Sequence, residues 1–118
     1  MLMRSLAWVT IAATEAVSNA VNIGEKLLCG VQMPAAWTAA DLTFEVSLDG
    51  VTWKSLTSTS GAEITVASPA AGALIALDPS DYLLAQLVRV RSGTAETPVA
   101  QAAERQITLV ARKFYPIG

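Results

Sequence analysis

The sequence contains no histidine and a single cysteine, Cys29, and these shortages remove most common catalytic chemistry. Without histidine there is no Ser-His-Asp or Cys-His arrangement and none of the usual imidazole ligands for zinc. One cysteine allows neither an intrachain disulfide nor a thiolate metal cluster. Glycine-rich phosphate loops of the GxGxxG or GxxxxGK[ST] type are also missing. The sequence therefore predicts a protein that is not an enzyme and uses no cofactor and no metal.

Charged residues are scarce as well, at 15% of the chain, and ten Asp and Glu against eight Lys and Arg give a net charge of −2. Nucleic-acid-binding proteins carry a basic stripe that releases counterions from the phosphate backbone. The chain has no such stripe, so we expect no nucleic-acid partner. No apolar run approaches the roughly 20 residues of a membrane-spanning helix, so we expect no membrane partner either.

The first twenty residues share features with a signal peptide, because Arg4 precedes a short apolar stretch. Thr10 and Glu15 interrupt that stretch, however, and we interpret it as a strand.

Apolar residues make up 53% of the chain, which is enough for one packed domain spanning residues 1–118. The mean hydropathy of +0.45 is high for a soluble monomer of this size. Apolar surface left over after folding usually marks a contact site. The composition therefore favours a permanent interface, although a dense alanine-rich core would raise the index equally.

The clearest strand pattern is Leu42–Leu48, where apolar and polar side chains alternate as in a strand with one buried face. Asp49-Gly50 follows and predicts a tight hairpin, because both residues tolerate positive φ. On the return strand, Trp53 is expected to face the core together with Phe44.

The rest of the chain reads as short strands divided by Gly, Pro, Ser and Asp turns. These strands are Leu6–Ala12, Val17–Ile23, Lys26–Met33, Glu63–Ala67, Ala73–Leu77, Leu84–Arg91 and Arg105–Lys113. Single helical turns are expected at Ala35–Asp41 and Pro79–Leu84, the second preceded by Asp78. Strands at this spacing without helical crossovers predict an all-β, largely antiparallel sandwich or barrel.

Three local motifs have structural explanations. Asp78 and Asp81 could bind calcium in a loop, but a helix-capping turn explains them better. Ser47–Trp53 is similar to the Asp-box of sialidases, S-x-D-x-G-x-T-W, yet it is one residue shorter between Asp and Gly. We interpret it as an ordinary Asp-Gly hairpin, and we interpret Cys29 as a small buried thiol.

Aromatic residues are few, at 6% of the chain, and three of them are candidate contact residues for a protein interface. Trp37 lies in a predicted loop, and Phe114 and Tyr115 lie in the C-terminal tail. Aromatic side chains are common anchors of interfaces. Each of the three could equally close one end of the sandwich.

Several passages resemble small proteins encoded beside capsid genes in tailed phages and prophages. They are Gly30–Thr38, Phe44–Trp53, Arg89–Thr94 and Gln101–Leu109. The resemblance covers most of the chain after about residue 20, and its motifs are turn and core signatures. It implies a jelly-roll-like β-sandwich of about eight strands with one or two short helical turns. It also implies the role of a capsid decoration or cement protein, which clamps neighbouring capsid subunits.

The partners implied by this resemblance are the major capsid protein and further copies of the chain, as a dimer or trimer at a local symmetry axis. The implied location is the exterior of the virion capsid, after synthesis in the bacterial host cytoplasm. Two alternatives stay open. One is another virion component, such as a head-tail adaptor, tail or head-fibre base protein. The other is a carbohydrate-binding β-sandwich module, in which an exposed Trp37 and Tyr115 would stack on sugar rings.

Overall fold

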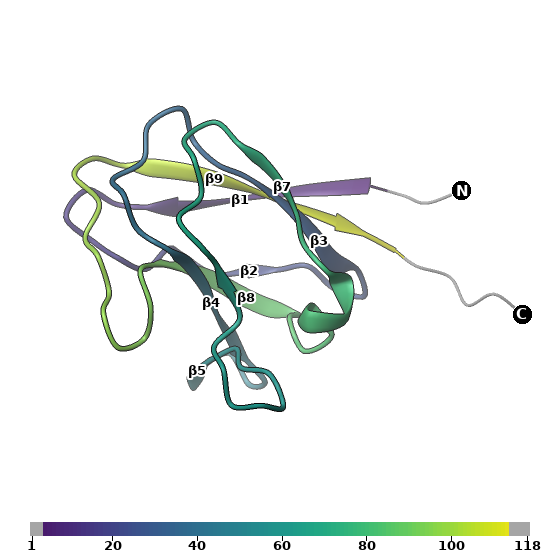
Figure 1. Cartoon of the computed structure of the whole chain (residues 1–118). Helices are drawn as coiled ribbons and strands as arrows, with labels where there is room; N and C mark the ends of the chain where they lie inside the picture. Colours follow the sequence, from purple (N-terminus) through teal and green to yellow (C-terminus); the bar gives the residue numbers. More distant parts are fainter. Residues whose placement is uncertain (1–3, 114–118) are drawn as a thin grey trace, which may run out of the picture.

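A computed structural model describes residues 4–113 of the 118-residue chain. These residues form nine strands and one 3-10 helix, η1. The elements are β1 (Arg4–Ile11), β2 (Val21–Asn22), β3 (Leu27–Gln32), β4 (Leu42–Ser47), β5 (Trp53–Ser55), β6 (Thr65–Val66), β7 (Leu74–Ala76), η1 (Pro79–Tyr82), β8 (Leu87–Ser92) and β9 (Arg105–Arg112). Two antiparallel sheets pack face to face, which confirms the predicted all-β sandwich (Figure 1).

The strand order is that of a jelly roll. Sheet A has the order β1-β9-β3-β7 and sheet B the order β2-β8-β4-β5, while β6 pairs with β4 off this path. The pairs are nested, because β1 pairs with β9, β2 with β8, β3 with β7 and β4 with β5. Rolling up one long antiparallel hairpin in this way gives two four-stranded sheets. The jelly-roll prediction is therefore confirmed, with about eight strands on the main path.

The core lies between the two sheets and is made by alternate residues of the longer strands. Fully buried side chains come from sheet A at Val9, Ile11, Leu28, Val31, Ile107 and Leu109, and from sheet B at Leu42, Phe44, Val88 and Val90. The ring of Tyr82, in η1, meets the ring of Phe44 edge-on at 5.0 Å between centroids. Burial raises the pKa of Tyr82, and the charge of Asp81 adds to this effect. Tyr82 thereby attaches η1 to the core.

The predicted strand Val17–Ile23 is interrupted in the structure, and Val21–Asn22 alone forms β2. Ser18 causes the interruption. Its backbone N–H donates to Val90 O at 2.9 Å, while its hydroxyl, in place of a backbone carbonyl, accepts from Val90 N at 3.0 Å. A side chain that replaces the backbone acceptor breaks the regular ladder.

The expected helical turn at Ala35–Asp41 is wrong, because tertiary contacts hold this segment as an irregular loop. The indole of Trp37 donates to Ala40 O at 3.2 Å, and the buried side chain of Gln101 bonds both the N–H and the C=O of Thr38. The second expected turn is present as η1, and Asp78 caps it by accepting from Ser80 N. The chain continues in turns after η1. Strand β8 therefore begins at Leu87 and not at Leu84, where the sequence predicted it to begin.

Cys29 is half-buried and lies at an irregularity of β3 between Leu28 and Gly30, so the expectation of a buried thiol is wrong. Its thiol donates weakly to Val110 O at 3.5 Å. Within the residues that the structure describes, no helix is long and apolar enough to cross a membrane.

Candidate binding surfaces

The outer face of sheet B is polar and bonded within itself. The guanidinium of Arg91, whose side chain is only 7% exposed, pairs with Glu45 at 3.1 Å and with Glu63. Its remaining donors reach Thr43 and Ser55, at 3.1 and 3.0 Å. Because these charges and donors have partners inside the chain, this face rigidifies the fold rather than offering a free recognition group.

Trp53 also lies on this outer face, which corrects its expected place in the core. The register pairs Ser47 with Trp53, and so gives both residues the same face of sheet B. The guanidinium of Arg89 lies 4.5 Å from the centre of the Trp53 ring, in cation–π geometry.

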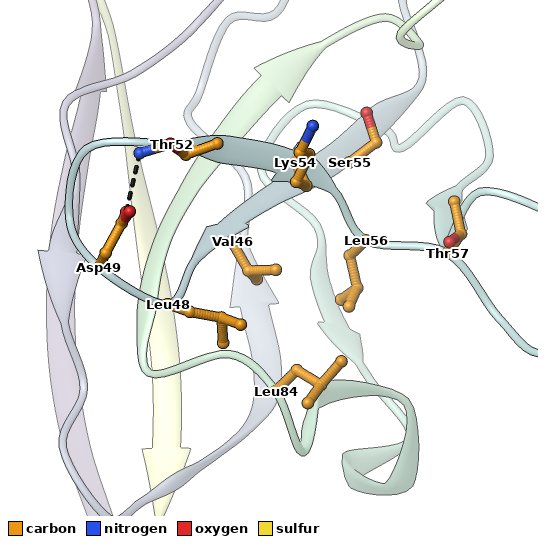
Figure 2. A pocket seen from close by; sticks show the side chains of 9 residues that line it. All are labelled: Val46, Leu48, Asp49, Thr52, Lys54, Ser55, Leu56, Thr57 and Leu84. Atoms are coloured by element: carbon orange, nitrogen blue, oxygen red, sulfur yellow. Dashed lines mark hydrogen bonds between the residues drawn. The ribbon is translucent and has the colours of Figure 1, made fainter.

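The β4–β5 hairpin is confirmed, but its turn differs from the expected one. Five residues, 48–52, connect Ser47 to Trp53. Gly50 has a φ of +79°, whereas Asp49 does not take a positive φ. The Asp49 carboxylate accepts from the N–H groups of Val51 and Thr52, both at 2.8 Å, and from the Ser47 hydroxyl. Figure 2 shows the bond to Thr52. These bonds hold the longer loop closed.

The same bonds change the acidity of the loop. Donation from the N–H groups of Thr52 and Val51, and then from the Ser47 hydroxyl, holds the pKa of Asp49 below its usual value. The carboxylate is ionised at neutral pH, the form in which it accepts these hydrogen bonds.

Next to this loop, large apolar side chains gather in what we call the leucine patch. It consists of Leu48, Leu83 and Leu84 at the surface, which are 89, 68 and 62% exposed, with Val46 and Leu56 beneath them. Figure 2 shows Leu48, Val46, Leu56 and Leu84 directed into one hollow, of about 470 Å³. A second hollow, lined by Leu48, Leu83 and Leu84 among others, adjoins it.

The fold explains why these leucines are exposed. Tyr82 and Ala85 are buried, so the two residues between them, Leu83 and Leu84, are forced outward at the end of η1. Leu48 is held out by the Asp49-bonded loop. Exposed apolar side chains on well-anchored backbone typically form protein contact sites, because little conformational entropy is lost on binding.

The outer face of sheet A is a second apolar surface. Leu6 and Trp8 of β1 and Leu74 of β7 are 41, 53 and 72% exposed. A shallow hollow of about 500 Å³ lies between these strands, over β9 and β3, with Arg4 and Arg112 at one end. The two outer faces of the sandwich therefore differ, one polar and one largely apolar.

The candidate contact residues from the sequence lie apart from both surfaces or outside the described part. Trp37 is half-buried, packs against the core and uses its indole N–H on Ala40. Phe114 and Tyr115 lie beyond residue 113, outside the residues that the structure describes. Their role in contacts stays a prediction.

Sequence reasoning missed the leucine patch, although a signal for it was present. Leu48 stands directly before the Asp-Gly turn, and Leu83-Leu84 directly follow a capped turn. Apolar residues at turn positions depart from the usual pattern and indicate either a contact site or a docked loop. Their spatial proximity depends on the β4–β5 register and could not be read from the sequence.

Among residues 4–113, no group of three or more His, Cys, Asp or Glu side chains lies close enough to hold a metal ion. Comparison of the chain with known protein families, with curated proteins and with solved structures finds no significant match.

Proposed function

We propose that this protein is a non-catalytic binding domain that works within a permanent protein assembly, as a capsid decoration or cement protein of a phage particle. The leucine patch is the observation that carries the proposal. Three exposed leucines beside a hollow floored by Val46 and Leu56 form an apolar surface that a partner side chain would fill.

The jelly-roll scaffold suits this role. It presents the patch on a hairpin whose Val46 and Leu56 are buried and on a helical turn whose Tyr82 is buried against Phe44, so the surface is formed before the partner arrives. Jelly rolls occur in viral capsid proteins and in lectins, so the fold alone does not distinguish these functions. The choice of a capsid shell as partner is supported by the sequence resemblance.

Carbohydrate binding has less support. A sugar platform needs neighbouring exposed aromatic rings, and of the five aromatic residues within residues 4–113 only Trp8 is exposed. Trp37 and Trp53 are half-buried, while Phe44 and Tyr82 are buried in the core.

The first test is genetic. Deleting the gene from the phage that encodes the chain should leave shells that assemble but release their DNA at a lower temperature than the parent. DNA release is followed by dye fluorescence during heating, and copy number by cryo-electron microscopy. Unchanged release would contradict a cement role, and about a dozen copies at one vertex would indicate an adaptor instead.

The second test addresses the patch. The double substitution Leu48→Asp and Leu84→Asp places charges in the apolar contact and should weaken binding to purified shells by roughly a hundredfold, as expected for two anchor residues. Cosedimentation with shells that lack the protein measures this. Leu74→Asp is the matched control, since Leu74 is 72% exposed, between Leu84 and Leu48, but lies on sheet A. If only Leu74→Asp abolished binding, the contact surface would lie on sheet A and not at the leucine patch.

A further inference from the structure

The edge of sheet A formed by β1 is open. The N–H of Thr10 donates to Asn19 Oδ1 at 2.7 Å, and its carbonyl accepts from Asn19 N at 3.3 Å, so the backbone groups of Thr10 point away from β9. In a strand, the backbone N–H and C=O groups of every second residue point to the same side. The N–H and C=O groups of Leu6 and Trp8 therefore face outward, and within residues 4–113 no bond outside the strand ladder engages them.

This edge also lacks the features that normally prevent edge-to-edge association. Such features are proline, inward-pointing charge, a bulge or a very short strand. From Ser5 to Ile11 there is no proline and no charged residue, and the pairing of β1 with β9 runs through eight residues without a shift. The other sheet edges are short, with two residues in β2 and three each in β5 and β7.

We propose that the occupant of this edge is β1 of a second copy of the chain, paired antiparallel so that two four-stranded sheets become one continuous sheet. The proposal identifies a surface for self-association and does not depend on what else the protein binds.

The favoured register is the one that pairs the most outward-facing residues of the described part, because setting Arg4 opposite Leu6 would pair only these two. A two-fold axis at Leu6 places Leu6 opposite Leu6 of the second copy and Arg4 opposite Trp8, so outward-facing groups meet outward-facing groups. Each hydrogen-bonded pair exchanges two N–H···O bonds, and three such pairs supply about six. A shift that sets Leu6 opposite Trp8 would put Arg4 against Thr10, where Asn19 already occupies the edge. A shift that sets Arg4 opposite Arg4 would place like charges together.

The side chains agree with this register. Arg4, Leu6 and Trp8 share the outer face of sheet A, and Trp8 is 53% exposed. In the proposed pair each Arg4 guanidinium lies across from the Trp8 indole of the other copy, a cation–π combination, while the two Leu6 side chains meet at the axis. One strand thus contributes both halves of each complementary contact, as a two-fold interface requires.

Sedimentation velocity and amide hydrogen exchange test the proposal together. The full chain should sediment as a concentration-dependent dimer, and the amides of Leu6 and Trp8 should be protected, although they face outward in a single copy. Leu6→Pro removes the outward N–H at the axis without touching the β1–β9 ladder. Because it deletes two hydrogen bonds per dimer, it should raise the dimer dissociation constant roughly a hundredfold.

Leu74→Pro is the matched control. Leu74 is also an exposed leucine on the same sheet. Ala73 O accepts from Met33 N and Leu77 N donates to Cys29 O, so residues 73, 75 and 77 bond toward β3 and the N–H of Leu74 faces the opposite edge. It should leave the dimer intact. If Leu6→Pro unfolds the chain, Leu6→Arg keeps the N–H and sets like charges at the axis, and it should give a folded monomer. A wild-type monomer at high concentration would overturn the proposal. A dimer with unprotected Leu6 and Trp8 amides, or one that Leu6→Arg leaves intact, would also overturn it.

Discussion

Gly93 is required by both its backbone conformation and its surroundings. It has a φ of +88°, and a Cβ there would lie 2.7 Å from Val99 N, 2.9 Å from Pro98 Cα and closer still to Thr97 O. We expect Gly93→Ala to destabilise the protein by at least about 2 kcal/mol, because overpacking adds to the strain of a positive φ. Urea unfolding measures this loss. Gly72→Ala is the control, with a φ of +75° and nothing within 4 Å, and it should cost about 1 kcal/mol. Equal losses would show that crowding at Gly93 is unimportant.

Asp49 makes the order of the hairpin loop dependent on pH. Its pKa in the folded protein lies below the ordinary value of 3.8, so its stabilising effect is complete above that value and is lost as the pH falls through the lowered pKa. Asp49→Asn should speed amide exchange of Val51 and Thr52 at neutral pH, since the neutral amide is a weaker acceptor. At acid pH the variant and the parent should converge. A difference that persists at acid pH would contradict this assignment.

At the scale of elements, Arg91 joins β8 to β4 and to the segment that carries Glu63. Arg91→Ala would remove a cation that Glu45 and Glu63 share, leaving Glu45 with Arg89 alone and Glu63 with the N–H of Ala95, and should cost about 3 kcal/mol. Thermal and urea unfolding would record the loss. Arg89→Ala, at a pair that is 29% exposed on the arginine side, should cost only about 1 kcal/mol. Similar losses for the two variants would show that Arg91 has no special place in the network.

At the scale of the whole molecule, the first strand completes the fold by pairing with the last. Val9 and Ile11 of β1 are fully buried, and β1 covers β9, whose Ile107 and Leu109 belong to the core. A chain that begins at Ala12 should therefore not fold. Its amide proton NMR signals should show the narrow chemical-shift dispersion of an unfolded chain. A well-dispersed spectrum matching that of the full chain would contradict this expectation.

The sequence allowed the class of fold and much of the core to be predicted. Alternation placed Phe44 inside, the acidic cap located η1, and strand spacing without crossovers indicated antiparallel sheets. The expected loop conformations failed where tertiary partners decided them, as Gln101 does for Thr38. The leucine patch was hidden because its members come from separate segments of the chain.

Trp53 shows where local pattern ends and tertiary structure begins. A two-residue Asp-Gly turn would set Trp53 opposite Val46 and so in the core, whereas the five-residue loop sets it opposite Ser47 and so outside. A strand reverses its faces with every one-residue change of register, and register depends on turn geometry that Asp49 and its partners settle in space. By itself the sequence determined an all-β chain with antiparallel strands. Strand pairing in the tertiary structure decided which apolar side chains stay exposed at the surface, where a partner could contact them.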